Sequence, residues 1–101
     1  MKCYVFAYGT LLDAKVRKDV IGYETTAYPA TLKGYSLDRV VIDQVSYPAL
    51  VVDNTTNNRV QGEIFEIEQN DLILLDRYET KSYQRILVSL ESGLKAWTYI
   101  K

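Results

Sequence analysis

Short runs rich in β-branched and aromatic residues recur along the whole chain, and Gly, Pro, Asn or Asp bounds most of them. Such runs are typical of β-strands, and the bounding residues are typical of turns. We expect six strands, at residues 3–8, 28–37, 48–53, 59–67, 83–91 and 95–100. Most connections between them are too short for the helical crossovers that a doubly wound parallel sheet requires.

Two polar segments predict reversals of the chain. Residues 53–58 read Asp-Asn-Thr-Thr-Asn-Asn, and we expect a turn there whose flanking strands pair as a hairpin. Glu91-Ser92-Gly93 predicts a second turn, which leads into the last strand.

Two short helices are expected between the strands. The first covers about residues 14–21, where Asp13 is suited to the N-cap and Gly22 to the end. Its apolar stripe contains Leu12, Val16 and Val20. The second covers about residues 70–78, and its start is capped by Asn70 or Asp71. Its apolar side contains Leu72, Leu74, Leu75 and Tyr78. These elements predict one α+β domain over residues 1–101, with a small mixed β-barrel or strongly coiled sheet and two short flanking helices.

Composition narrows the classes of function. The formal net charge is −1, from 12 basic and 13 acidic residues along the chain, so no basic stripe points to nucleic acid. No apolar run approaches the ~20 residues of a membrane span, and the first residues lack a signal-peptide pattern. The chain has no His and one Cys, so we expect no metal site, no cofactor, no internal disulfide and a cytoplasmic location.

The first strand runs directly into Tyr8-Gly9-Thr10-Leu11, and a helix start follows. A turn between a strand and a helix start leaves backbone N–H groups unpaired and convergent, which suits a carboxylate or a developing oxyanion. The alternative is an ordinary turn in which Gly9 relieves backbone strain.

Glu79 is the second candidate site residue. At ~100° per residue it falls between Leu72 and Leu75, close to the apolar stripe of the second helix. Desolvation and the negative end of the helix dipole would both raise the pKa of its carboxyl, toward the range of a proton shuttle. Alternatively, Glu79 is exposed, or pairs with Lys81 or Arg85.

The chain contains nine tyrosines, and most are expected to be amphipathic residues of the sheet with hydroxyls at its rim. Tyr83 and Tyr99 are expected near the mouth of a pocket. We interpret Tyr47-Pro48-Ala49-Leu50 as a structural turn that enters a buried strand.

Five motifs occur in an order and spacing that resemble the gamma-glutamylcyclotransferase-like superfamily, most closely its AIG2-like branch, which includes gamma-glutamylamine cyclotransferases. They are Val5-Phe6-Ala7-Tyr8-Gly9-Thr10-Leu11, Tyr47-Pro48-Ala49-Leu50-Val51, Val60-Gln61-Gly62-Glu63-Ile64-Phe65-Glu66-Ile67, Leu74-Leu75-Asp76-Arg77-Tyr78-Glu79 followed by Tyr83-Gln84-Arg85, and Trp97-Thr98-Tyr99-Ile100.

The resemblance implies a small barrel with a cavity between the 8–11 loop and Glu79. It also implies that a gamma-glutamyl amine or gamma-glutamyl amino acid is converted to 5-oxoproline and a free amine or amino acid. Glu79 would be the general base and acid, and the backbone of Tyr8, Gly9, Thr10 and Leu11 would hold the glutamyl group. We expect Tyr83 to contact this small-molecule substrate, and the protein to be a monomer or weak homodimer.

One alternative comes from a different class of function. A loop of free N–H groups captures carboxylates whether or not chemistry follows. The same fold could therefore be a non-catalytic binding module for a small carboxylate ligand. A nucleic-acid-binding small barrel is disfavoured by the near-neutral charge.

Overall fold

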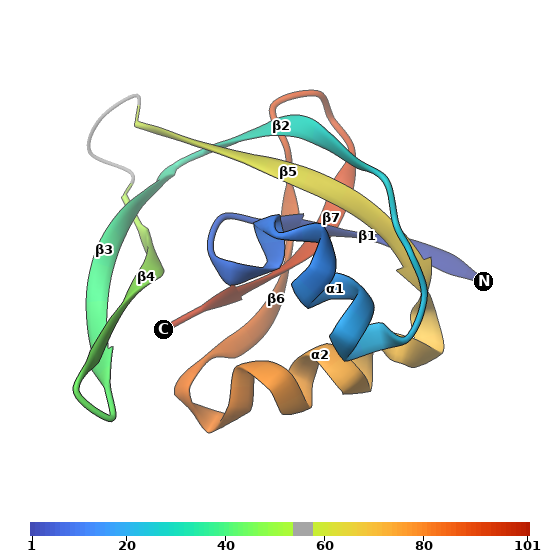
Figure 1. Cartoon of the computed structure of the whole chain (residues 1–101). Coiled ribbons are helices and arrows are strands. Elements are labelled where there is room, and N and C mark those ends of the chain that lie inside the picture. Colours follow the sequence, from blue (N-terminus) through green and yellow to red (C-terminus); the bar gives the residue numbers. More distant parts are fainter. Residues whose placement is uncertain (54–57) are drawn as a thin grey trace.

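The computed structural model describes residues 1–53 and 58–101 (Figure 1). Its strands are β1 (Lys2–Ala7), β2 (Ala27–Lys33), β3 (Tyr35–Ile42), β4 (Val45–Val52), β5 (Arg59–Glu68), β6 (Gln84–Ser89) and β7 (Lys95–Ile100). The α-helices are α1 (Ala14–Ile21) and α2 (Leu72–Glu79). Three single 3₁₀ turns are η1 (Thr10–Leu12), η2 (Gln69–Asp71) and η3 (Thr80–Ser82).

The strands form one five-stranded sheet and one separate hairpin. The sheet has the order β2-β5-β1-β7-β6, and its neighbours are antiparallel except for the parallel pair β1 and β7. Strands β3 and β4 pair only with each other in the described residues, and they curve around one side of the molecule (Figure 1). The α+β class is confirmed. In the described chain, however, β2 and β6 remain outer strands, so the sheet is strongly curved but is not closed into a barrel.

The strand predicted over residues 28–37 is two strands that meet at Gly34. Gly34 has a φ of 85°, a conformation that favours glycine. Its N–H donates to the carbonyl of Asn58, and its own carbonyl accepts from the N–H of Asp53. The chain therefore changes partner at Gly34. Before this residue β2 pairs with β5, and after it β3 pairs with β4.

The hairpin predicted across residues 53–58 is wrong. Strand β4 pairs with β3, and the neighbours of β5 in the sheet are β1 and β2. The real hairpin turns at Asp43 and Gln44, whose φ values of 49° and 68° fit a tight two-residue turn. Residues 54–57 of the predicted turn lie outside the described residues. The second predicted turn is confirmed, since β6 and β7 pair across it.

Helix α1 has the predicted bounds and caps. Asp13 accepts a hydrogen bond from the N–H of Lys15 at 2.8 Å, and Gly22 ends the helix with a φ of 92°. The predicted apolar stripe is only partly right, because Leu12 belongs to η1 and is 39% exposed. The buried residues of α1 are instead Arg17 and Ile21. Within the described ranges, no helix is long and apolar enough to cross a membrane.

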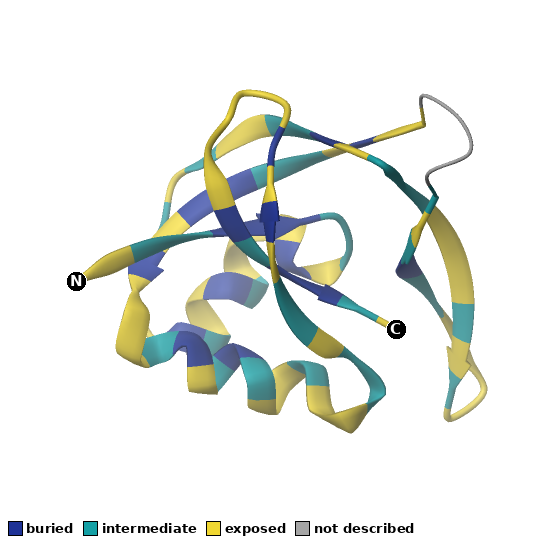
Figure 2. Cartoon of the chain, turned by 180° about the vertical axis from the view of Figure 1, so that it is seen from behind, coloured by how far each residue is buried: buried dark blue, intermediate teal, exposed yellow. Residues whose placement is uncertain are grey.

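The core lies on both faces of the sheet (Figure 2). On β1, Val5 and Ala7 pack with the helices, whereas Phe6 packs with the opposite cluster, as expected for alternating side chains of a strand. Leu75 of α2 is buried in the first cluster, and Leu50 of β4 is buried in the second. Both helices therefore cover one face of the sheet near the end of β1, while β4 is anchored beside the other.

Candidate active site

A cavity of about 250 Å³ lies where the end of β1, the β3–β4 hairpin and the end of α2 meet. Each of these three segments contributes lining residues, and Tyr83 and Tyr99 complete the wall. The lining residues are Phe6, Ala7, Tyr8, Gly9, Thr10, Leu11, Ile42, Tyr47, Pro48, Tyr78, Glu79, Thr80, Tyr83 and Tyr99. Its volume is close to the lower end of the ~300–1,000 Å³ range of small-molecule sites.

The 8–11 loop leads from β1 into the turn η1. Within this turn, the N–H of Leu12 donates to the carbonyl of Gly9 at 3.0 Å, and the N–H of Asp13 donates to that of Thr10 at 3.1 Å. The first N–H groups of a helical turn have no partner inside it. Gly9 also approaches the hairpin closely, because a Cβ placed on it would lie 3.2 Å from Cγ of Pro48.

A buried arginine, Arg17, binds the backbone at the end of this loop. Arg17 is only 3% exposed, and one of its terminal nitrogens donates to the carbonyls of Leu11 and Leu12, both at 3.0 Å. Its Nε donates to the hydroxyl of Thr25 at 2.8 Å, and its guanidinium lies 5.3 Å from the ring centre of Phe65. The carbonyl groups of the loop are thus turned toward α1 and held in place.

Glu79 is the last residue of α2 and lines the cavity. Burial raises the pKa of its carboxyl from 4.5 to about 7. The direction agrees with the prediction, and the physical cause is desolvation. Among the described residues no ion pair involves Glu79, whereas the Arg85 expected as an alternative partner pairs with Asp76 at 3.5 Å. Glu79 is also the only Asp or Glu among the described residues that line the cavity.

The residue after Glu79 has an unusual backbone conformation. Thr80 lines the cavity with a φ of 62° and a ψ of −168°, a region that residues with a side chain rarely adopt. Its N–H donates to the carbonyl of Asp76 and so ends the helix. Such a conformation costs about 1–3 kcal/mol and persists only where the surrounding structure imposes it.

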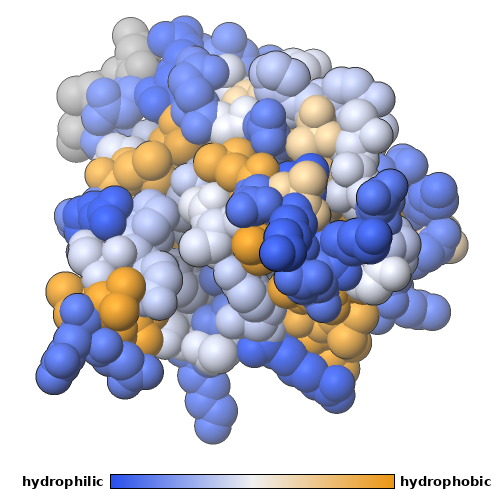
Figure 3. Space-filling model, viewed as in Figure 1, coloured by the Kyte–Doolittle hydropathy of each residue, from blue (hydrophilic) through white to orange (hydrophobic). Residues whose placement is uncertain are grey.

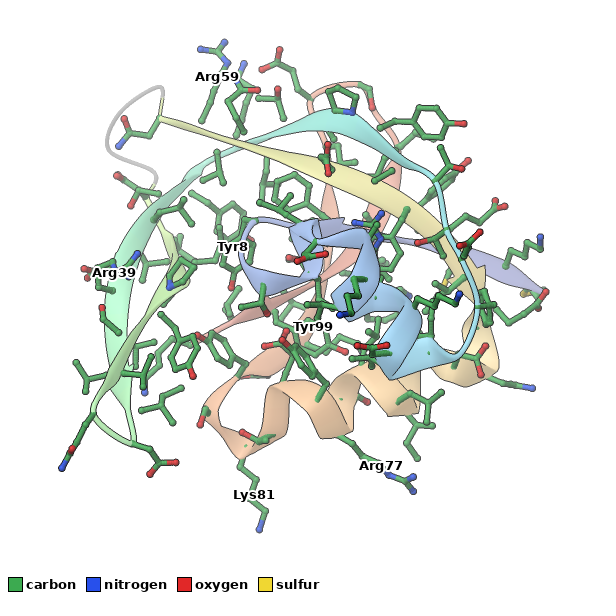
Figure 4. All side chains as sticks on the ribbon, viewed as in Figure 1. Tyr8, Arg39, Arg59, Arg77, Lys81 and Tyr99 are labelled. Atoms are coloured by element: carbon green, nitrogen blue, oxygen red, sulfur yellow. The ribbon has the colours of Figure 1, made fainter. Side chains whose placement is uncertain are left out.

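Tyrosine hydroxyls connect the segments around the cavity. That of Tyr8 donates to the carbonyl of Tyr99, and that of Tyr83 donates to the carbonyl of Pro48 at 3.0 Å. The hydroxyl of Tyr99 donates to Asp76 at 2.6 Å. Burial, above all, raises the pKa of Tyr8, Tyr83 and Tyr99, so these phenols stay neutral near neutral pH. In Figure 4, Tyr8 and Tyr99 lie inside the molecule.

All the site residues predicted from sequence line this one cavity: Tyr8, Gly9, Thr10, Leu11, Glu79 and Tyr83. Tyr99, expected near the pocket mouth, also lines it and is buried. The structure adds Tyr47 and Pro48, which were interpreted as purely structural, and Tyr78, which was assigned to the apolar side of a helix. No local sequence signal distinguishes them, because they reach the cavity through tertiary packing. For Arg17, its i,i+4 spacing to Ile21 could have indicated a shared buried face.

Comparison with known proteins gives a family match and structures of similar fold. Residues 5–101 match the model of the family described as "Gamma-glutamyl cyclotransferase, AIG2-like". A protein named "Putative gamma-glutamylcyclotransferase" from Halalkalibacterium halodurans is 33% identical over 63 residues. That alignment covers 55% of this chain and 56% of the relative, so the matched part spans little more than half of that protein.

Solved structures share the fold. A solution structure from Arabidopsis thaliana superposes with a TM-score of 0.80 at 25% identity, over 98% of this chain and 68% of that one. A structure named "Gamma-glutamyl cyclotransferase" gives a TM-score of 0.77 over 99% of this chain and 66% of that one, and at 16% identity it supports the fold alone. Because the family match runs from the first strand to the last residue, the chain belongs to the AIG2-like gamma-glutamyl cyclotransferase family.

Proposed function

We propose that the protein converts a gamma-glutamyl amine or gamma-glutamyl amino acid into 5-oxoproline and a free amine or amino acid. The observation that carries this proposal is the position of Glu79, whose carboxyl lines the same cavity as the 8–11 loop and has a pKa raised to about 7. A carboxyl with that pKa accepts and returns a proton efficiently near neutral pH.

In the proposed reaction, the Glu79 carboxylate takes a proton from the α-ammonium of the substrate. The resulting amine attacks the side-chain amide carbon, and the carbonyl oxygen becomes an oxyanion. Glu79 then returns the proton to the leaving nitrogen, and the bond between that nitrogen and the carbon breaks. The ring nitrogen, which still carries one extra proton after attack, passes it through Glu79 to the departing amine, so the neutral five-membered lactam and an ammonium product remain. Atoms and charge balance without water or a co-reactant. Ring closure is intramolecular, so a bound geometry close to attack supplies much of the acceleration.

The 8–11 loop is proposed to hold the glutamyl group through backbone N–H groups. No Lys or Arg is among the described residues of the cavity wall, so a substrate carboxylate would depend on these backbone donors. Arg17 turns the carbonyls of Leu11 and Leu12 toward α1, which stabilises one conformation of the loop. Tyr83 is proposed to contact the substrate, since its ring lines the cavity while its hydroxyl is bonded to Pro48.

The test is release of 5-oxoproline from a panel of gamma-glutamyl amines and gamma-glutamyl amino acids. We expect wild type to release it and Glu79→Gln, which keeps the shape of the side chain, to lose at least about 10²-fold in kcat. Glu24→Gln is the matched control, because Glu24 is exposed and lies outside this cavity. Full activity of Glu79→Gln would overturn the mechanism. Equal binding of glutamyl compounds by wild type and Glu79→Gln, without product from either, would instead identify a non-catalytic binding module.

A further inference from the structure

We infer that the leaving amine is uncharged and apolar along its chain, and that the β3–β4 hairpin forms the wall that selects it. This inference rests on the proposed function, because it assigns a substrate class to the same cavity. The glutamyl group would lie in the cavity between the 8–11 loop and Glu79. The lining residues that then remain for the leaving amine include Ile42, Tyr47 and Pro48 of the hairpin.

Except for Tyr47, whose hydroxyl has no hydrogen bond within the described residues, the tyrosines and threonines of the wall are already bound to protein partners. The hydroxyls of Tyr8, Tyr83 and Tyr99 donate to Tyr99, Pro48 and Asp76, and those of Thr10 and Tyr78 bond to each other at 2.5 Å. The hydroxyl of Thr80 lies 3.3 Å from that of Ser82. Their rings and methyl groups, rather than their donors, therefore face a ligand.

The charged residues around the cavity also favour an uncharged leaving amine. In the described part of the wall, Glu79 is the only Asp or Glu, and its carboxyl is committed to the proton transfers. Arg85 and Asp76 pair with each other, and Arg77 of α2 and Lys81 of η3 extend outward (Figure 4). A charged group on the leaving amine would lose its hydration against tyrosine rings and gain no counter-charge, which is costly.

The hairpin continues the apolar wall outward. Val45, the cross-strand partner of Ile42, shares its face of the hairpin and is 49% exposed. Hydrophobic residues gather over the turn end of the hairpin on the face seen in Figure 3. A chain that leaves the cavity in this direction meets aliphatic side chains, and burial of each methylene group against them favours binding.

The test uses three amides of glutamic acid that differ only at the end of a four-carbon amine. They are gamma-glutamylbutylamide, its cationic 4-aminobutyl analogue, and the anionic gamma-glutamyl-4-aminobutyrate. We expect kcat/KM for the neutral amide to exceed both others at least about tenfold. Tyr47→Phe should keep this preference, whereas Tyr47→Glu should shift it about tenfold toward the cationic amide. Tyr28→Glu adds the same charge to an exposed residue outside the cavity and should change nothing.

The outcomes separate the inference from the function on which it rests. Equal or higher kcat/KM for a charged amide overturns the apolar leaving group while cyclotransferase activity stands. A preference for the cationic amide would show that the tyrosine rings bind an ammonium group, as aromatic cages do. No 5-oxoproline from the three amides, when another gamma-glutamyl compound is converted, overturns the apolar leaving group alone, whereas no 5-oxoproline from any gamma-glutamyl compound overturns both proposals.

Discussion

The hydroxyl oxygens of Thr10 and Tyr78 lie 2.5 Å apart and join the 8–11 loop to the last turn of α2 across the rim of the cavity. Both residues are exposed, and 68 positions separate them in the sequence. The bond links the two segments that carry the proposed binding and proton-transfer groups. It therefore fixes the distance between them.

Removing this bond should weaken binding more than folding. We expect Tyr78→Phe to raise KM for the best gamma-glutamyl substrate about 2- to 10-fold, which corresponds to the loss of one net hydrogen bond. The free energy of unfolding should fall by less than about 1 kcal/mol, because the bond is exposed. Steady-state kinetics and urea denaturation give the two values. Tyr28→Phe, at an exposed site outside the cavity, is the control, and an unchanged KM in Tyr78→Phe would contradict the linking role.

The ionisation of Glu79 should set the acidic limb of the activity profile. The proposed mechanism needs its carboxylate to take the first proton, and the pKa of this carboxyl is about 7. We expect kcat/KM to rise with pH through an apparent pKa near that value, as measured between pH 5 and 8. A limb that falls instead near the ordinary carboxyl value of 4.5 would show that another group controls the reaction.

The same shift predicts a pH dependence of stability. The folded state holds the Glu79 proton more tightly than the unfolded chain, so stability should decrease as pH rises from about 4.5 to about 7. The loss is at most about 3 kcal/mol, and solvent screening of the partly exposed carboxyl reduces it. Glu79→Gln lacks this titration. Thermal unfolding should find it more stable than wild type at pH 8 and about equal at pH 4, and equal differences at both pH values would contradict the buried ionisation.

The buried guanidinium of Arg17 should be important for stability. Arg17→Ala leaves a space and removes the donors to the carbonyls of Leu11 and Leu12, so we expect a loss of about 2–4 kcal/mol in unfolding free energy. Lys18→Ala on the same helix removes only an exposed ion pair and should change it by less than about 0.5 kcal/mol. If chemical denaturation finds the two variants equal, Arg17 does not stabilise the loop.

Gly62 of β5 keeps the end of β1 in place. A Cβ on this residue would lie 2.3 Å from the carbonyl oxygen of Ala7 and 2.7 Å from the ring of Phe6. Gly62→Ala should therefore cost about 1–3 kcal/mol or more of unfolding free energy, because the backbone that precedes the 8–11 loop has to shift. Gln61→Ala, at an exposed neighbouring position, is the control. Equal denaturation midpoints for the two variants would contradict this close packing.

Local signals in the sequence were sufficient for several elements. Asp13 and Gly22 mark the ends of α1 because capping depends on a few adjacent residues. The helical period also placed Glu79 beside buried leucines, and burial is the physical cause of its raised pKa. The α+β class followed from the number and spacing of short strands, and the family resemblance placed the 8–11 loop and Glu79 at one cavity.

The strand partners, and the part of the cavity wall formed by Tyr47 and Tyr78, could not be predicted from local signals in the sequence. The pairing of β4 with β3 rather than β5 depends on which strands lie beside β5 in the sheet. The amino-acid types at residues 53–58 give no information about these neighbours. In the sequence, Gly34 resembles an ordinary strand residue. Its role as the junction of β2 and β3 is visible only in the structure, where it bonds to both Asn58 and Asp53. Tyr47 and Tyr78 line the cavity only because the hairpin and α2 converge on the same loop.

The most direct measurement is a crystal structure of the protein with bound 5-oxoproline. We expect the ring in the cavity, with its carboxylate on N–H groups of the 8–11 loop and its ring nitrogen about 3 Å from a carboxyl oxygen of Glu79. Product bound elsewhere, or bound in the cavity with the Glu79 carboxyl directed into solvent, would contradict the proposed role of this residue.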